Sequence, residues 1–522
     1  MKMQQLIHNG VYIPPKPEYI GFTIKFRGKP IKLAPEQEQM AIAWVQKSKT
    51  KYAKDGVFVR NFFKDFRKAL NLKGRVYPRD FDFSEIEKYL EQQKRKKESL
   101  SKEEKAKINA ARREQRQKIK EKYGYAIVDG VKMELENYVI EPSGIFMGCA
   151  KHPLRGRWKP GATQEDIILN LSPDAPKPPG NWKAIVWNPN VLWIAQWKDK
   201  LTRKMKYVWL AHSSPPKQIN DIIKFEKAKE LDVNLNRVRK VINRCIKAPD
   251  PKIRKIATVI YLIDSLCLRV GDEKDPDEAD TVGACTLRPE NIKIKGNKVI
   301  FDFYGKGAVH WHKERLMSQP VIDNLEEFIA EAKSEVFEGI NSKMVNKFLG
   351  RIMPGLTAKV FRTHHATKTV EETLATAKVK PDHPDYIKKH ALIMANLGAA
   401  VVCNHKRAPP KNWKQLLEKR KQRLKQLQGK NTKRAKIARA KLRLKIREMK
   451  MVKDYNLRTS LKSYIDPRVI YRWCQQVNYD WRKYYPKTFQ RRFSWIENPE
   501  TVKQWVQNHP YPQEVKQIIQ NI

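Results

Sequence analysis

The sequence predicts an α+β fold with more than one domain, on three observations. The chain has 522 residues, several times the roughly 100 to 150 residues of a usual domain. Apolar residues recur at helical spacing in some segments, and short runs of apolar and polar residues alternate around turns in others. A segment near position 430 is strongly basic and poor in apolar residues. We therefore expect a mixed α/β N-terminal part, a mainly helical central part and an antiparallel helical hairpin.

The N-terminal part, from Tyr19 to about His212, mixes helical and strand patterns. Phe62, Phe66 and Leu70 fall at i, i+4 and i+8, the spacing of one buried helix face. A platform on which nucleic-acid bases stack is the alternative interpretation of the same aromatic residues. The first interpretation predicts that this helix packs into a core.

Two further elements belong to this part. Ser101 followed by Glu104 has the spacing of a capping box, which predicts a helix that runs to about Lys122. This helix carries many cations, so it is either a solvated arm or an arm that faces phosphates. The runs 191–197 and 206–211 are aromatic and β-branched around a polar turn, and they predict a β-hairpin.

A proline-rich piece at 212–217 is the predicted domain boundary. Helical patterns dominate after it, and one apolar stripe is predicted to end in Arg269, with Gly271 as the stop signal. The stripe consists of Ile256, Val259, Ile260, Ile263, Leu266 and Cys267.

Residues 291–312 alternate between apolar and polar types around a Gly-Asn turn at 296–297, which predicts a second β-hairpin. Another turn follows at 305–307. It would place Lys306 at an exposed tip between two glycines.

Residues 411–450 contain 17 Lys or Arg against two Glu, with sparse apolar residues. Gly429 and its polar neighbours would turn the chain. Because the apolar stripe is too thin for a core, a projecting, basic, antiparallel helical hairpin is predicted.

The charge of the chain points to a polyanionic partner. Lys and Arg number 106 against 56 Asp and Glu, which gives a formal charge of +50. Nucleic acid is the leading candidate, because each phosphate neutralised by Lys or Arg releases condensed counterions. No stretch approaches the roughly 18 to 20 apolar residues of a membrane span, and the first ten residues lack the apolar core of a signal peptide. We expect a soluble, non-secreted protein without membrane contact.

Motif searches find little other chemistry. The six cysteines lie far apart, so neither a disulfide framework nor a structural metal is indicated, and buried thiols are expected. No G-x-x-x-x-G-K-[ST] loop indicates ATP use. The acidic segment 272–280, with Asp275 and Asp277, is either a solvated loop or a Mg²⁺ site. Residue patterns alone therefore indicate a DNA or RNA binder, with action on phosphates as an open alternative.

Several blocks of the sequence resemble, in order, the signature blocks of eukaryotic-type DNA topoisomerase IB. They are LCLRVGDEKDPDEADTVGACTLRPENI from Leu266, FDFYGKG from Phe301, GLTAKVFRT from Gly355, CNHKRAPPK from Cys403 and SYIDPRVIYRWC from Ser463. The resemblance continues upstream through NFFKDFRK, SKEEKAKI and QEDIILNLS, and so covers most of the chain from about Tyr19.

The resemblance implies five catalytic residues. Tyr464 would attack a DNA phosphodiester and form a 3′-phosphotyrosine. Arg269, Arg362 and His405 would donate to the non-bridging oxygens, and Lys306 would protonate the departing 5′ oxygen. The free 5′ end would swivel before it reattacks, which relaxes supercoils of either sign. No ATP, metal or other cofactor is implied.

The resemblance also implies an architecture. Residues 1–212 would be the N-terminal cap, one half of a clamp around duplex DNA, and 217–410 the mainly helical, tyrosine-recombinase-like catalytic core. Residues 411–453 would be a basic coiled-coil linker, and 454–522 the C-terminal segment that carries the nucleophilic tyrosine. Double-stranded DNA would be gripped through phosphate contacts, largely without regard to sequence. A monomer is expected.

The sequence departs from the family pattern at several positions. His364 and His365 replace a usual Tyr-Asn pair, Gly307 replaces an acidic residue, and Ser463 replaces the Asn before the tyrosine, which puts sensitivity to camptothecin-type poisons in doubt. His365 joining the phosphate site is an alternative. The long charged N-terminal extension of eukaryotic enzymes is missing, which favours an archaeal or other minimal version. The expected location is the cytoplasm, on the nucleoid, of a prokaryote or the nucleus of a eukaryote.

Two rival functions stay open. A tyrosine recombinase or integrase shares the Arg, Lys, Arg, His and Tyr set, but such enzymes lack this cap region and assemble on specific sites. A non-catalytic architectural protein shares the charge, but it would form no covalent adduct with DNA.

Overall fold

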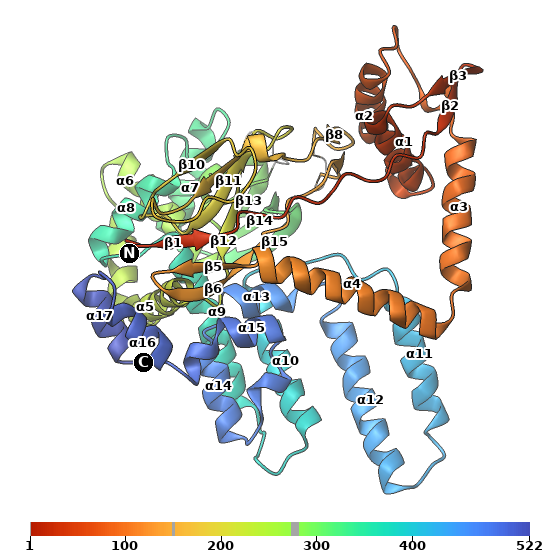
Figure 1. The fold of residues 1–522 in the computed structure, drawn as a ribbon. Helices are drawn as coiled ribbons and strands as arrows, with labels where there is room; N and C mark the ends of the chain where they lie inside the picture. Colours follow the sequence, from red (N-terminus) through yellow and green to blue (C-terminus); the bar gives the residue numbers. More distant parts are fainter. Residues whose placement is uncertain (1, 149–151, 273–280) are drawn as a thin grey trace. The chain divides into compact units, whose positions relative to one another are not determined.

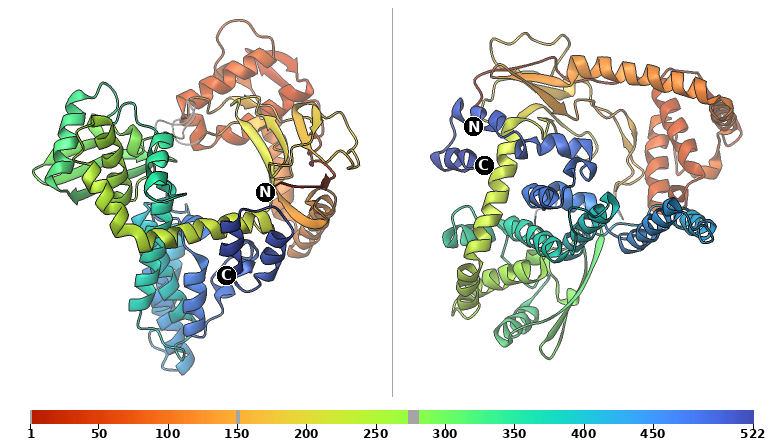
Figure 2. Two further views of the ribbon diagram at one scale, coloured as in Figure 1. Left: turned by 90° about the vertical axis from the view of Figure 1, so that its left-hand side faces the viewer. Right: turned by 90° about the horizontal axis from the view of Figure 1, so that it is seen from below.

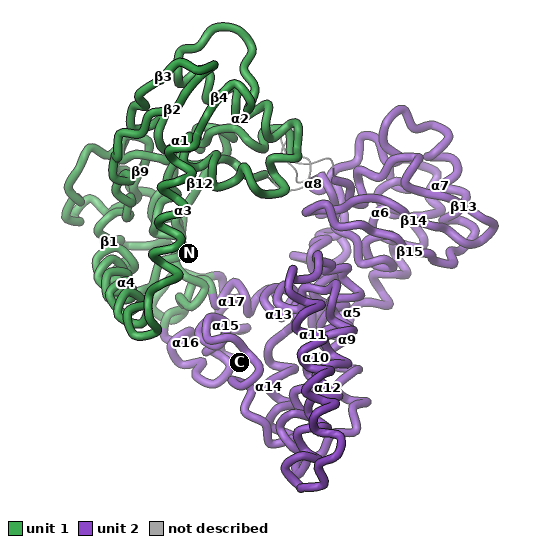
Figure 3. Tube along the Cα trace, turned by 90° about the vertical axis from the view of Figure 1, so that its right-hand side faces the viewer, with its two compact units in different colours: residues 1–217, 505–511 green, residues 218–504, 512–522 purple. Residues whose placement is uncertain are grey.

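The computed structural model describes residues 2–148, 152–272 and 281–522 (Figure 1). Over these ranges the chain forms two compact units (Figure 3). Unit 1 comprises residues 1–217 and 505–511, and unit 2 comprises residues 218–504 and 512–522. The chain passes from one to the other within helix α5 (Pro215–Cys245), next to the predicted proline-rich boundary. Helices with several small sheets confirm the predicted α+β class.

The first part of unit 1 packs helices on a small sheet. Strands β2 (Thr23–Phe26), β3 (Lys29–Lys32) and β4 (Phe81–Asp82) form a sheet in the order β3-β2-β4 beside helices α1 (Pro35–Ser48), α2 (Gly56–Ala69) and α3 (Ser84–Ser99). Phe62 and Phe66 of α2 are fully buried, and Phe62 stacks on Trp44 with ring centroids 5.0 Å apart. These rings are core residues, so the base-stacking alternative is wrong for them.

Helix α4 (Lys102–Tyr123) begins with the predicted capping box. The Glu104 amide donates to Ser101 Oγ at 3.1 Å, and the Ser101 amide donates to the Glu104 carboxylate at 2.7 Å. None of the residues of this helix is buried. This exposure fits a solvated arm and an arm that faces phosphates equally, so both alternatives stay predictions.

A seven-stranded sheet completes unit 1, in the order β1-β5-β6-β12-β11-β9-β10. Its strands are β1 (Leu6–His8), β5 (Tyr125–Val128), β6 (Val131–Glu136), β9 (Ile167–Asn170), β10 (Ala184–Val186), β11 (Trp193–Lys198) and β12 (Met205–Leu210). The antiparallel pair β11–β12 confirms the hairpin predicted from the aromatic runs. A separate pair, β7 (Gly144–Ile145) and β8 (Trp158–Lys159), lies outside this sheet.

Unit 2 is mainly helical. Besides α5 it contains α6 (Pro251–Leu266), α7 (Gln319–Glu331), α8 (Ser342–Ile352), α9 (Ala358–Thr376) and α10 (Asp385–Val402), with α9 and α10 side by side (Figure 2). A three-stranded sheet, β13 (Ile292–Lys295), β14 (Lys298–Gly305) and β15 (Val309–Leu316), confirms the second predicted hairpin. Phe301 and Phe303 of β14 join the core formed by α6 to α9.

The predicted end of helix α6 was wrong. The helix ends at Leu266, and Cys267, not Gly271, is the left-handed residue that stops it, with φ 59°. Arg269 is therefore in the following loop and not in the last helical turn. The Cys267 carbonyl, which has no partner within the helix, accepts from a side chain elsewhere in the fold, the Arg362 guanidinium.

The basic segment forms the predicted antiparallel hairpin of α11 (Trp413–Gln426) and α12 (Lys433–Met451), which projects from the rest of unit 2 (Figure 1). Its base is held by Glu448, which is buried and lies 3.1 Å from His390 of α10. The chain then continues through α13 (Leu457–Ser463), α14 (Pro467–Gln476), α15 (Lys487–Arg492), α16 (Glu500–Gln507) and α17 (Gln513–Gln520). Among the helices described here, none is long and apolar enough to cross a membrane.

Candidate active site

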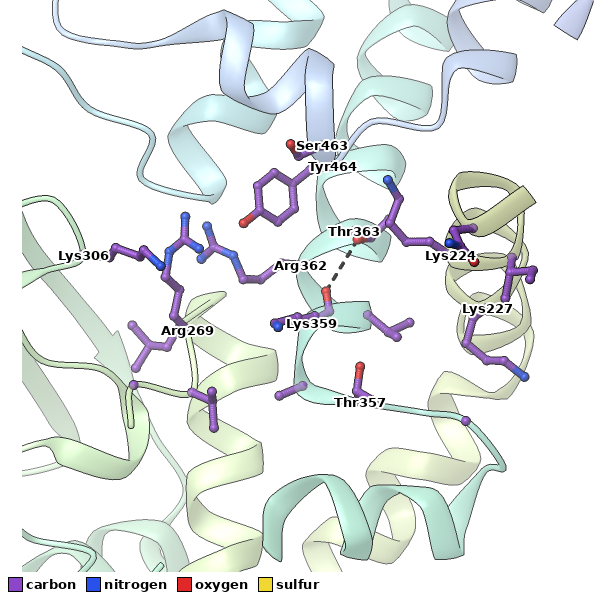
Figure 4. A pocket seen from close by; sticks show the side chains of 18 of the residues that line it. Lys224, Lys227, Arg269, Lys306, Thr357, Lys359, Arg362, Thr363, Ser463 and Tyr464 are labelled. Atoms are coloured by element: carbon purple, nitrogen blue, oxygen red, sulfur yellow. Dashed lines mark hydrogen bonds between the residues drawn. The ribbon is translucent and has the colours of Figure 1, made fainter. Parts of the chain in front are cut away.

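A cavity of about 670 Å³ in unit 2 is lined by residues of α5, α9 and α17, by the loop after α6 and by the end of α13. Arg269, Lys306, Arg362 and Tyr464 line it, and their side chains point toward one another (Figure 4). A smaller hollow of about 160 Å³ shares Arg269 and Lys306 and adds His405. All five residues singled out from the sequence therefore line one or both of two hollows, and Arg269 and Lys306 line both.

Arg362 is the buried cation of this site, with 3% of its surface exposed. Its guanidinium donates to the backbone carbonyl of Cys267, to that of Cys403 at 3.0 Å, and to Nε2 of His405 at 3.3 Å. The guanidinium carbon lies 5.1 Å from the centre of the Tyr464 ring. A permanent positive charge is thereby held against the phenol.

His405 is buried beside the same phenol, with ring centroids 5.0 Å apart. Burial, reinforced by the charges of Arg362 and Arg269, lowers the pKa of His405 to about 3, so the imidazole is neutral at pH 7. Because Arg362 donates to Nε2, the proton belongs on Nδ1, which lies 2.7 Å from the Ser460 hydroxyl oxygen and donates to it.

The Tyr464 backbone is fixed to helix α9, which also carries Arg362. The Thr367 hydroxyl donates to the Tyr464 carbonyl at 3.1 Å, and it accepts from the Asp466 amide at 3.0 Å. Tyr464 caps α13, and Asp466 caps the next helix by accepting from the Arg468 amide. The phenol therefore leaves the backbone at a short, hydrogen-bonded break between two helices.

The Arg269 loop is held by an unusually close backbone contact. Gly271 has φ +113°, and a Cβ on it would lie 2.6 Å from the Gly283 Cα. The Ala284 amide donates to the Arg269 carbonyl at 2.8 Å. Glycine at both positions lets the two segments meet and fixes the backbone from which the exposed Arg269 side chain reaches the cavity.

Lys306 lies at the turn between β14 and β15, as predicted, and is exposed. Gly307, with φ +77°, supplies the left-handed conformation that the turn needs. The base of the hairpin is fixed by the Val282 amide, which donates to the Tyr304 carbonyl at 2.8 Å, and by Asn404, which donates to the His310 carbonyl at 3.1 Å.

His364 and His365 have other partners. His364 Nε2 lies 2.8 Å from Asp232, and His365 Nε2 lies 2.8 Å from Asp264, which also binds Arg239. Burial would raise the pKa of Asp264, but its hydrogen bonds from His365 and Arg239 hold that pKa below its usual range. His365 is not among the residues that line the cavity, and its contact with Asp264 gives it a structural partner instead. The alternative that it joins the phosphate site stays a prediction.

The acidic segment at 272–280 falls mostly outside the structure: Asp275 and Asp277 lie outside the described residues. Asp272, which is described, accepts a hydrogen bond from the Ser342 amide at 2.5 Å. Within the described ranges, no group of three or more His, Cys, Asp or Glu side chains is placed to hold a metal ion.

Sequence reasoning missed Ser460 and Thr367. The only signal for Ser460 was its place one helical turn before Tyr464, and nothing in the local sequence marks Thr367. Each contacts a site residue far away in the chain, Ser460 the His405 ring and Thr367 the Tyr464 backbone.

Comparison with known families assigns the class. The model of the eukaryotic DNA topoisomerase I DNA-binding fragment matches residues 1–210, that of the eukaryotic DNA topoisomerase I catalytic core matches 213–438, and that of the C-terminal topoisomerase domain matches 434–507. The chain belongs to the eukaryotic DNA topoisomerase I family.

Individual relatives agree. DNA topoisomerase 1 of Homo sapiens is 32% identical over 545 residues, covering 95% of this chain and 71% of the human protein. DNA topoisomerase 1 of Candidozyma auris is 37% identical over 442 residues, covering 82% of this chain and 58% of the relative. DNA topoisomerase 1 of Drosophila melanogaster is 32% identical over 529 residues, covering 95% of this chain and 54% of the relative. The chain thus spans little more than half the length of the latter two. All three relatives are eukaryotic, so they lend no support to the archaeal assignment.

Proposed function

We propose that this chain is a type IB DNA topoisomerase, which relaxes positive and negative supercoils by transient cleavage of one strand. Tyr464 attacks a phosphodiester: its phenol releases its proton to solvent, the phenolic oxygen bonds to phosphorus, and the 5′ oxygen of the cut strand leaves. The bond energy is kept in a 3′-phosphotyrosine, so religation needs no ATP. One observation carries the proposal: the phenol of Tyr464 lies against Arg362 and His405 in a cavity that Arg269 and Lys306 also line.

The cations have distinct tasks in this proposal. Arg362 and Arg269 donate to the non-bridging oxygens as charge develops there in the five-coordinate transition state. Arg362 is preorganised for this task, because carbonyls already hold its guanidinium in place. Lys306, at an exposed hairpin tip, protonates the departing 5′ oxygen. The side-chain cations thereby take the role that metal ions have in other phosphoryl-transfer enzymes.

His405 acts as a neutral donor. In the structure its Nε2 accepts from Arg362, so donation to a phosphate oxygen requires the proton to move from Nδ1 to Nε2. The Ser460 hydroxyl makes this change possible without losing its contact, because a hydroxyl can accept from Nδ1–H in one tautomer and donate to Nδ1 in the other.

DNA is the proposed partner, gripped largely through its phosphates by a monomer. The charge of +50 supports a sequence-independent grip. The division into cap (1–212), catalytic core (217–410), linker (411–453) and tyrosine segment (454–522) is part of the proposal. An archaeal or other minimal source, and a location on the nucleoid or in the nucleus according to that source, stay predictions, as does the weakened response to camptothecin-type poisons.

The basic hairpin α11–α12 is proposed to lie near the downstream duplex and to slow its rotation. Deletion of residues 415–450 should then leave the cleavage rate intact and change the number of supercoils removed per cleavage event, measured on single DNA molecules. Loss of cleavage would instead give the hairpin a role in assembling the site.

The decisive experiment is relaxation of a supercoiled plasmid in EDTA without ATP. The wild-type chain should relax it, Tyr464→Phe should not, and Tyr471→Phe, at a tyrosine of α14 outside the cavity, should behave like wild type. Peptide mapping should find the DNA 3′ end on Tyr464. Relaxation by Tyr464→Phe would reject the proposal.

The rival functions have their own signatures. Synapsis of two marked duplexes at specific sites would favour a recombinase. Denaturing gels without any protein attached to a 3′ end would favour an architectural protein. Membership of the topoisomerase I family supports relaxation over both.

A further inference from the structure

Lys313 is a charged residue on the face of its strand that otherwise packs against the core. In β15 it pairs with Phe301 of β14, and Trp311 on the same side of the strand pairs with Phe303. Phe301, Phe303 and Trp311 are all buried, so this face of the hairpin belongs to the core. A cation at such a position costs desolvation energy, and burial lowers the pKa of Lys313. It needs compensating contacts.

Backbone carbonyls at the ends of two helices supply those contacts. Lys313 Nζ donates to the Leu266 carbonyl at the end of α6 at 3.3 Å, and to the Val402 carbonyl at the end of α10 at 3.2 Å. The last carbonyls of a helix have no intrahelical partner and carry the negative end of its dipole. One ammonium group thus satisfies an orphan acceptor of each helix and joins the two helix ends.

Arg362 repeats this arrangement one residue further along both segments. Its guanidinium donates to the Cys267 carbonyl and to the Cys403 carbonyl, as described above. Lys313 and Arg362 together form what we call the carbonyl clamp, two cations that each bridge the same two helix ends.

We propose that Lys313 is a positioning residue for the cleavage reaction, which sets the spacing of the other catalytic cations through the carbonyl clamp. The inference rests on the proposed function. Arg269 comes three residues after Leu266, and His405 comes three residues after Val402. Lys313 is also on the strand that follows the Lys306 turn.

Three separate segments therefore converge on one ammonium group: the loop that carries Arg269, the loop that carries His405 and the hairpin that carries Lys306. Arg362 joins only the first two of these by its side chain. Lys313 joins the hairpin to both helix ends through one group, in addition to the hydrogen bonds of Val282 and Asn404 described above. Its loss should therefore misplace the three catalytic groups relative to one another while the DNA-gripping surface stays intact.

The test uses the full chain and a short duplex whose 5′-hydroxyl fragment diffuses away after cleavage, so that the covalent complex accumulates. Lys313→Met keeps the length of the stem and removes the donors. Lys313→Arg restores a cation, and Lys293→Met, at an exposed lysine of β13, is the matched control. The single-turnover rate constant at saturating protein, the DNA dissociation constant and the final covalent fraction are measured for each.

The rate constant of Lys313→Met should fall at least about tenfold while the dissociation constant stays within about twofold and the covalent fraction is unchanged. Lys313→Arg should recover most of the rate, and Lys293→Met should match wild type. An unchanged rate constant in Lys313→Met, a fall in covalent fraction alone, or no recovery with arginine would overturn the proposal.

Hydrogen exchange supplies a readout without catalysis. Peptides that cover 266–271 and 402–406 should exchange faster in Lys313→Met than in wild type. In Lys293→Met they should exchange at the wild-type rate. If Lys313→Met does not fold, Lys313→Gln replaces it in this measurement. Unchanged exchange would contradict the positioning role. A wild-type chain that forms no adduct would refute the proposed function, whereas the exchange result would still decide whether Lys313 orders the two loops.

Discussion

Ser460 is fully buried, and its hydroxyl oxygen lies 2.7 Å from Nδ1 of the His405 imidazole. A hydroxyl is both a donor and an acceptor. It can therefore keep its hydrogen bond to Nδ1 of His405 when the ring proton moves from one imidazole nitrogen to the other. Its contribution is therefore expected in the transition state and not in DNA binding.

Replacing Ser460 by Ala should lower the single-turnover cleavage rate about tenfold, equivalent to about 1.4 kcal/mol, with unchanged DNA affinity. The reason is that Nδ1 of His405 loses the partner that stabilises either tautomer. Rapid-quench cleavage assays measure the rate. Ser214→Ala, at a buried serine that donates to the Ala211 carbonyl in unit 1, is the control. An equal loss in both variants would show a general packing effect instead.

The lowered pKa of His405 predicts how stability depends on pH. The unfolded chain binds a proton on this residue near pH 6.5, whereas the folded chain does so only near pH 3. The unfolded state thus holds more protons between these values, so this stabilising contribution is complete above about pH 6.5 and is lost as the pH falls toward 3.

Thermal unfolding between pH 7 and pH 4.5 checks this sign. His405→Gln should lose less melting temperature over that range than wild type, because glutamine does not titrate. Burial also lowers the pKa of His8 to about 4. Because His8 is present in both proteins, its effect on the melting temperature cancels when the two pH dependences are subtracted. Parallel losses in the two proteins would mean that His405 is protonated in the folded state.

At the scale of elements, the loop after α6 depends on two glycines that touch. A Cβ on Gly283 would lie 2.3 Å from the Gly271 Cα, a distance that no packing change of a side chain relieves, because both atoms belong to the backbone. The loop must move if either position gains a side chain, and Arg269 moves with it.

Gly283→Ala should therefore lower both the melting temperature and the cleavage rate, the latter by at least about tenfold if Arg269 shifts by an ångström. Gly350→Ala in α8 is the matched control, because a Cβ there meets open space and alanine favours a helix. Its melting temperature should stay level or rise. A fully active Gly283→Ala protein would show that the backbone contact does not set the position of Arg269.

At the scale of the whole molecule, the surplus of 50 positive charges should dominate the proposed association with DNA. Each phosphate neutralised releases counterions, so the logarithm of the binding constant should fall steeply and linearly with the logarithm of salt concentration, by roughly 0.9 per phosphate engaged. Fluorescence anisotropy of a labelled duplex of mixed sequence between about 50 and 200 mM salt measures the slope, for which we expect a loss of about 10³-fold or more. A flat dependence would contradict a grip on many phosphates.

Local signals in the sequence predicted the elements that depend on local physics. The capping box at Ser101, the turn that exposes Lys306 and the basic hairpin are each encoded within a few residues. Tyr464 was different: one of 19 tyrosines, it was distinguished only by the block around it.

Contacts between distant segments could not be predicted. Ser460 lies 55 residues from His405 and Thr367 lies 97 residues from Tyr464, so no spacing rule connects them. The Cys267 carbonyl at the end of α6 is a further example, because its partner Arg362 lies 95 residues later. Lys313 left one local sign, a charge on the apolar side of an alternating strand, but its partners were visible only in the fold.

The carbonyl clamp brings two sulfur atoms within 3.8 Å of each other, those of Cys267 and Cys403. The hydrogen bond from Cys267 and the nearby Arg362 charge favour the thiolate of Cys403. Hydrogen peroxide would convert that thiolate to a sulfenic acid, and attack by the Cys267 thiol would expel water and leave a covalent crosslink between the two segments. Preparations stored without reductant should therefore contain a fraction of crosslinked chains, which peptide mass spectrometry under non-reducing conditions would count.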